Sequence, residues 1–130
     1  MSGDWIRFTL FLRVLARQII VSLVLTILLE GVAAFVAGLR TGRQQKTLAL
    51  INVITNPVVV FLFYLYYYYG PGIPLNPLAF QLVLEAFVVL AEWRLLRMLL
   101  PELKKPFWWA FGLNLFSWGL WYLLELIVRR

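Results

Sequence analysis

The sequence contains no cysteine and no histidine. This excludes disulfides, thiol nucleophiles, imidazole bases, and zinc or haem sites that depend on these ligands. A Ser–His or Cys–His catalytic pair is therefore impossible, and the chain carries no metalloprotease motif. The composition predicts a protein that is not an enzyme of these classes, and no cofactor is expected.

Charge is also scarce, because only 14% of the 130 residues are charged whereas 63% are hydrophobic. A soluble domain of this size could not bury so much apolar surface in one core. The apolar residues fall in long blocks, which indicates an all-α, polytopic integral membrane protein. The net charge of +6 comes from basic residues that flank these blocks, so anionic lipid headgroups are the expected partner rather than nucleic acid.

Four apolar blocks predict a bundle of four transmembrane helices in a single domain over residues 1–130. The predicted spans are about 18–39, 47–69, 78–100 and 106–128. Residues 1–17 are expected to form a short N-terminal interfacial helix, or an extension of the first span. A signal peptide is disfavoured, because the apolar run continues beyond Glu30.

The loops between these spans are very short, so sequential helices should be antiparallel neighbours with both termini on one side. Asn76 and Pro77 should begin the third span, after an uncharged turn over 70–74. No internal repeat is identified. A small excess of Lys and Arg favours cytoplasmic first and third loops, although the N-terminal arginines oppose this orientation. The expected location is the cell (plasma or inner) membrane, with multiple passes.

The second span contains an unusually polar stretch, Asn52-Val53-Ile54-Thr55-Asn56-Pro57. Two carboxamides, a hydroxyl and a proline are costly in hydrocarbon, because polar groups lose water and proline frees a backbone carbonyl. Polar partners are therefore expected on the other helices.

The rise of an α-helix places such partners at one depth. At about 1.5 Å per residue, Glu30, Asn56, Glu92 and Asn114 each lie about 12–14 Å from the first- and third-loop side. The sequence thus predicts one interior cluster that binds a ligand or ion, with Ser117 as a further candidate. Its members are Glu30, Asn52, Thr55, Asn56, Glu85, Glu92 and Asn114.

Carboxylate and amide oxygens suit hard cations, an organic cation or a proton, and the identity of any metal is left open. Buried carboxyls are expensive and usually face a cavity, an ion or a proton path. The competing interpretation is that the polar residues only hold the helices together, at about 0.6–2 kcal/mol for each contact.

These observations support two main hypotheses. The first is a transporter of a cation, proton or small cationic solute, with Glu30 as the site, acting as a homo-oligomer through the small residues Gly31, Ala34 and Gly38. The second is a non-catalytic subunit or assembly factor of a larger membrane complex. A lipid-modifying intramembrane enzyme that uses the carboxylates is a weaker third interpretation.

The pattern of Glu30, the Asn52–Pro57 stretch, Glu85 and Glu92 resembles small bacterial four-helix membrane proteins with a VNxxTNP signature. The likeness covers the first three spans well and the fourth through Asn114. The resemblance implies a four-helix membrane protein and does not imply a particular activity.

Overall fold

A computed structural model describes residues 2–70 and 76–129 and contains four α-helices within these ranges. They are α1 (Gly3–Ala37), α2 (Gly42–Tyr69), α3 (Pro77–Leu99) and α4 (Pro106–Val128). The all-α prediction is confirmed. Most of the uncharged turn predicted over 70–74 lies outside the described residues.

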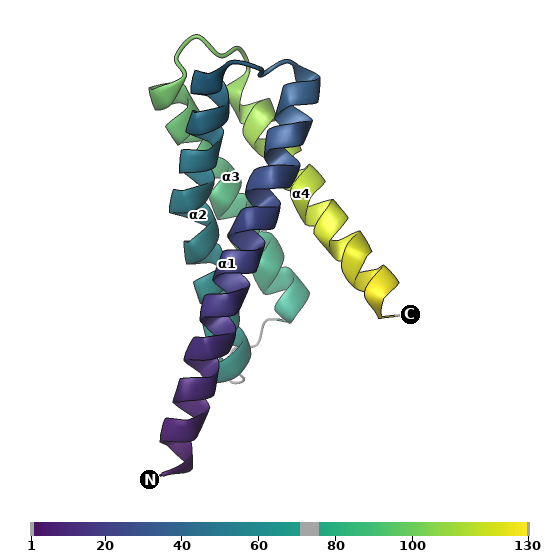
Figure 1. Cartoon of the computed structure of the whole chain (residues 1–130). Coiled ribbons are helices and arrows are strands. Elements are labelled where there is room, and N and C mark those ends of the chain that lie inside the picture. The colour runs from purple at the N-terminus through teal and green to yellow at the C-terminus, as the bar shows by residue number, and fades with distance from the viewer. Residues whose placement is uncertain (1, 71–75, 130) are drawn as a thin grey trace.

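The helices form an antiparallel bundle in which α1 packs on α2, α2 on α3, α3 on α4, and α4 on α1. The α1–α2 and α3–α4 connections lie together at one end, and the described ends of the chain lie toward the other (Figure 1). Towards its C-terminus, α4 leans away from α1, so the bundle widens at the end away from these two connections (Figure 1).

Local sequence signals explain where the helices begin and end. Gly38 ends α1 with φ of 123°, a conformation that favours glycine. Thr41 begins α2 with a capping box, in which its hydroxyl accepts from the Gln44 amide and the Gln44 side chain accepts from the Thr41 amide. Asn76 caps α3 ahead of Pro77, as predicted. The second span therefore starts at Gly42, five residues earlier than predicted from hydropathy at position 47.

The expectation of a separate short N-terminal helix is wrong. Residues 3–17 are the first part of α1, which is continuous over 35 residues. The physical reason is packing, because Phe11 and Leu15 are buried and the Phe11 ring makes edge contacts with Tyr68 and Tyr69 at the end of α2. The alternative prediction of an extended first helix describes this segment correctly.

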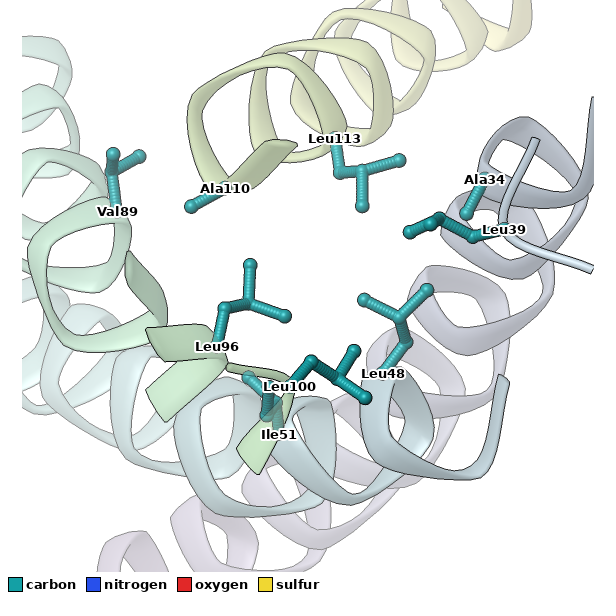
Figure 2. Close-up of a cluster of buried hydrophobic side chains, with 9 residues drawn as sticks. All are labelled: Ala34, Leu39, Leu48, Ile51, Val89, Leu96, Leu100, Ala110 and Leu113. Carbon is teal, nitrogen blue, oxygen red and sulfur yellow. The ribbon is translucent and has the colours of Figure 1, made fainter. Parts of the chain in front are cut away.

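The apolar core lies near the end of the bundle that holds the two short connections. Figure 2 shows side chains from all four helices meeting there. Arg43, in the first turn of α2, also links α2 to the α3–α4 connection, with an ion pair to Glu102 at 3.2 Å and a hydrogen bond to the Leu99 carbonyl at the end of α3. This end of the bundle is therefore closed by apolar packing. The core cluster comprises Ala34, Leu39, Leu48, Ile51, Val89, Leu96, Leu100, Ala110 and Leu113.

Three helices, α1, α2 and α4, are long and apolar enough to cross a membrane. Many large apolar side chains on the outside of the bundle are exposed, including Val36 at 72% and Phe87 at 67%. The surface is thus suited to a hydrocarbon surrounding. Helix α3 carries four charged residues within 23, namely Glu85, Glu92, Arg94 and Arg97, and is therefore more densely charged than α1 with five in 35.

The small residues near the end of α1 serve the contact within the chain. Ala34 is completely buried in the core, and the Gly31 carbonyl accepts a hydrogen bond from the Gln45 side chain on α2 at 3.2 Å. Because Ala34 is buried within the chain, its side chain is not available to a second copy, whereas Gly38 is exposed. A homo-oligomer contact through Gly31, Ala34 and Gly38 stays a prediction.

Candidate functional site

Two buried carboxyl groups form the centre of the polar cluster. Glu30 of α1 is 1% exposed. Its Oε2 accepts from Asn52 Nδ2 at 2.9 Å and its Oε1 accepts from Ser117 Oγ at 3.0 Å. One side chain of α1 is thus bonded to both α2 and α4.

Glu92 of α3 has the same arrangement. It is 4% exposed, and its Oε1 accepts from Thr55 Oγ1 at 2.9 Å. Its Oε2 accepts from Asn114 Nδ2. Helices α1 and α3 therefore supply the carboxyls, whereas α2 and α4 supply the donors.

The donors are held in place by their own helices. Asn52 Nδ2 also donates to the Leu48 carbonyl at 3.1 Å, and Asn114 Nδ2 donates to the Ala110 carbonyl at 2.7 Å. The Thr55 hydroxyl has one hydrogen, which it shares between Glu92 Oε1 and the Ile51 carbonyl one turn back. These bonds fix the orientation of the donor side chains relative to their own helices.

The two halves of the chain contain the same pattern at the same spacing. Positions 30, 52 and 55 hold Glu, Asn and Thr, and positions 92, 114 and 117 hold Glu, Asn and Ser, so the offset is 62 throughout. Buried apolar positions follow the same offset, since 34, 48 and 51 correspond to 96, 110 and 113. The α1–α2 and α3–α4 hairpins are therefore equivalent around the polar cluster, and they form an internal repeat that was not identified from the sequence.

The hydrogen bonds of the polar cluster follow the same pattern in both hairpins. Asn52 to Glu30 and Asn114 to Glu92 are bonds within a hairpin, whereas Thr55 to Glu92 and Ser117 to Glu30 cross between hairpins. Thr55 and Ser117 thus make equivalent contacts, because each donates from its own hairpin to the carboxyl of the other.

This equivalence predicts the outcome of exchanging the two hydroxyl residues. Thr55→Ser and Ser117→Thr should each change the free energy of unfolding by less than about 0.5 kcal/mol, because the hydroxyl is kept. Thr55→Val and Ser117→Ala should each cost about 1 kcal/mol, because a carboxyl oxygen loses its donor. Unfolding in mixed micelles of detergent and denaturing surfactant measures these changes. If only one of Thr55→Val and Ser117→Ala lowered the free energy of unfolding, the two hydroxyls would not have equivalent roles.

A cavity of about 390 Å³ extends from this cluster towards the wide end of the bundle. Glu85, Glu92 and Asn56 line it, as do Asn52, Thr55, Asn114 and Ser117. Beyond the cluster, towards the two short connections, the path is filled by the apolar core, with Leu96 one helical turn from Glu92. The cavity therefore ends at the polar cluster.

Glu30 does not line this cavity. It lies behind Asn52 and Ser117, whose side chains occupy both of its carboxyl oxygens. Glu85, by contrast, is half-buried and lines the cavity. Hydrogen bonds across the four helices bring together most of the predicted polar groups, namely Glu30, Asn52, Thr55, Glu92, Asn114 and Ser117. Asn56 and Glu85 join them only as residues that line the cavity. The sequence did not predict that only some of them face the open space.

Asn56 provides an acceptor in the cavity wall. Its Nδ2 donates to Thr26 Oγ1 at 3.3 Å, a partner that hydropathy and depth arguments did not identify. Its buried Oδ1 has no hydrogen-bond partner among the described residues. Buried polar atoms are usually satisfied, so this oxygen is a candidate contact for a bound donor or cation.

The wider part of the cavity is aromatic and carries charge of both signs. Tyr64, Trp118 and Trp121 line it, together with Arg17 and Glu125. Glu85, Glu92 and Glu125 give the lining more acidic than basic groups. Aromatic faces attract cations electrostatically, so the lining is suited to a positively charged ligand. The signal in the sequence was the cluster of aromatics in the second and fourth spans, which were interpreted only as interface residues.

Within residues 2–70 and 76–129 there is no group of three or more His, Cys, Asp or Glu side chains that could hold a metal ion. Comparison of the chain with family models, curated proteins and solved structures gives no match.

Proposed function

We propose that this chain is a multi-pass protein of the cell membrane that binds and transports a small cation through the cavity. Three helices apolar enough to span a bilayer, and the exposed apolar surface, support the membrane location. In this proposal α3 is the fourth span, with Glu85 and Glu92 turned towards the cavity rather than towards lipid.

The observation that carries the proposal is a cavity that ends at a buried carboxyl. Glu92 lies at its closed end with two fixed donors, and Glu85 lies nearby in the wall. A volume of about 390 Å³ is within the range of pockets for small organic molecules. A small organic cation can therefore use both the carboxyls and the aromatic lining.

The hydrogen bonds suggest how binding couples to movement. A cation at Glu92 competes with Asn114 and Thr55 for the carboxyl oxygens. Weakening these bonds frees α4 and α2 from α3 at the level where the apolar core begins. Separation of Leu96 from Leu113 would then open the path that the core closes.

Transport in proteoliposomes tests the proposal. Wild-type protein should move one or more members of a panel of protons, alkali ions and small quaternary amines. Glu92→Gln should lower the rate by about tenfold or more, which corresponds to about 1.4 kcal/mol of lost interaction. Glu102→Gln is the matched control, because Glu102 is exposed in the α3–α4 connection outside the cavity.

Two results would overturn the proposal. One is a wild-type protein that is silent across the whole panel, and the other is equal transport by the wild type and Glu92→Gln. Glu30→Gln should have a smaller effect on transport than Glu92→Gln, because Glu30 does not line the cavity.

A role as a subunit or assembly factor is the second candidate. It is favoured by Glu30, whose bonds are all within the bundle and join three helices. Extraction in mild detergent distinguishes the two roles. A stoichiometric unlike partner favours the assembly role, whereas an isolated chain or a homo-oligomer opposes it.

A further inference from the structure

A second hollow lies between α3 and α4. It has a volume of about 400 Å³ and is lined almost entirely by apolar side chains. On α3 these include Leu82, Ala86 and Leu90, and on α4 they include Phe107, Phe111 and Leu115. The spacing of three to four residues places each set on one helix face.

This groove adjoins the polar cavity. Glu85, Asn114 and Trp118 line both spaces, so these three side chains form the boundary between them. Glu85 lies near one end of the groove, and the apolar lining continues from there along α3 to Leu90. From position 82 to position 90, the groove follows about 12 Å of α3.

The junction is chemically asymmetric. On one side, the acidic residues Glu85 and Glu92 line the cavity together with Asn56, whose buried Oδ1 has no hydrogen-bond partner among the described residues. On the other side lie only apolar side chains of α3 and α4. A molecule that satisfies both sides needs a cationic head and a hydrocarbon tail.

We infer that the substrate class is a single-chain cationic amphiphile, with its head between Glu85 and Glu92 and its tail in the α3–α4 groove. Charge complementarity fixes the head in the cavity, and burial of apolar surface fixes the tail along Ala86 and Leu90. This inference rests on the proposed function and deepens it, because it names the substrate of the same cavity and a lateral route of entry from the bilayer.

Photolabelling tests the position of the tail. The probe is a long-chain alkyltrimethylammonium with a diazirine near the end of the tail, applied to protein in lipid nanodiscs. Labelled peptides should map to residues 86–90 of α3 and 107–115 of α4. Labelling at these sites should be competed by the same amphiphile without the diazirine.

Two variants separate the groove from the rest of the lipid-facing surface. Ala86→Phe should reduce labelling in the groove by about tenfold, because the added ring occupies the space of several methylene groups. Ala91→Phe is the matched control, because Ala91 is exposed on the same helix and lines neither space. If Ala86→Phe does not fold, Leu90→Trp fills the same groove and should give the same loss.

The head group provides the second discriminating measurement. Glu85→Gln should also lower labelling, and a probe with the same tail and a hydroxyl head should label the groove poorly. Equal labelling by the neutral probe, or label spread evenly over the apolar surface, would show a bilayer lipid filling the groove and overturn the inference. Transport of tetramethylammonium that depends on Glu92 but is unaffected by Ala86→Phe would leave the proposed function standing.

Discussion

Replacement of Asn52 by leucine is expected to lower the free energy of unfolding by about 2–3 kcal/mol, because a buried carboxyl then loses its donor. Asn52 is 2% exposed and donates to Glu30, which is 1% exposed. Leucine has a similar volume, so the cost comes from the unpaired polar atom rather than from a void. Surfactant-induced unfolding in micelles measures the change.

The second change in this pair should reverse most of the loss. When both members of a buried hydrogen bond become apolar, the desolvation cost disappears with the bond, and the result can be nearly neutral. We therefore expect Asn52→Leu/Glu30→Leu to be more stable than Asn52→Leu alone. Val53→Leu is the control, because Val53 is 49% exposed next to Asn52. Additive losses in the double variant would contradict a direct Asn52–Glu30 interaction.

Leu96→Ala should have an effect of similar or greater size. Leu96 is 2% exposed and lies in the core that closes the cavity. Truncation of a buried leucine to alanine usually costs about 2–5 kcal/mol, because burial is lost and a void remains. The same void lies next to the polar cluster, so the variant should also let protons or small cations leak across proteoliposomes.

The loss of stability and the leak expected for Leu96→Ala can both be compared with a control variant on the same helix. Met98→Ala should change stability by less than about 0.5 kcal/mol, since Met98 is 73% exposed on the same helix. A Leu96→Ala protein that unfolds like the wild type would show that the core tolerates the void. A destabilised variant that remains impermeable would show that the core does not form the barrier.

Much of the fold could be predicted from hydropathy and helix geometry. Four helices at nearly the predicted positions follow from the apolar blocks. The rise of a helix predicted a common depth for Glu30, Asn56, Glu92 and Asn114, but the partner of Glu30 is Asn52, one turn before Asn56, because α2 starts at Gly42. Helix boundaries that are set by side-chain hydrogen bonds were harder to predict from the sequence. The start of α2 depends on the capping box of Thr41, which lies in a polar segment where hydropathy gives no signal.

The sequence could predict which residues form the candidate site, but not which of their side chains face the cavity. A count of residues gives depth along a helix, whereas facing the cavity or facing another helix depends on rotation and packing. Glu30 and Glu92 have similar depth, yet only Glu92 lines the cavity. The repeat was also present in the sequence, but only a few of the residues at the offset of 62 are identical, so it becomes evident when the buried positions are known.

The equivalence of the two hairpins also bears on how the chain enters a bilayer. Each hairpin has a short connection that carries basic residues, and Arg43 of the first corresponds to Lys105 of the second at the same offset. Both connections lie at the same end of the bundle (Figure 1). If the chain spans a bilayer as proposed, the basic residues near both connections favour the same side of the membrane, whereas Arg7, Arg13 and Arg17 oppose this orientation in the first hairpin. The crossed bonds of Thr55 and Ser117 form only when both hairpins are in place, so they can fix the relative orientation of the two halves.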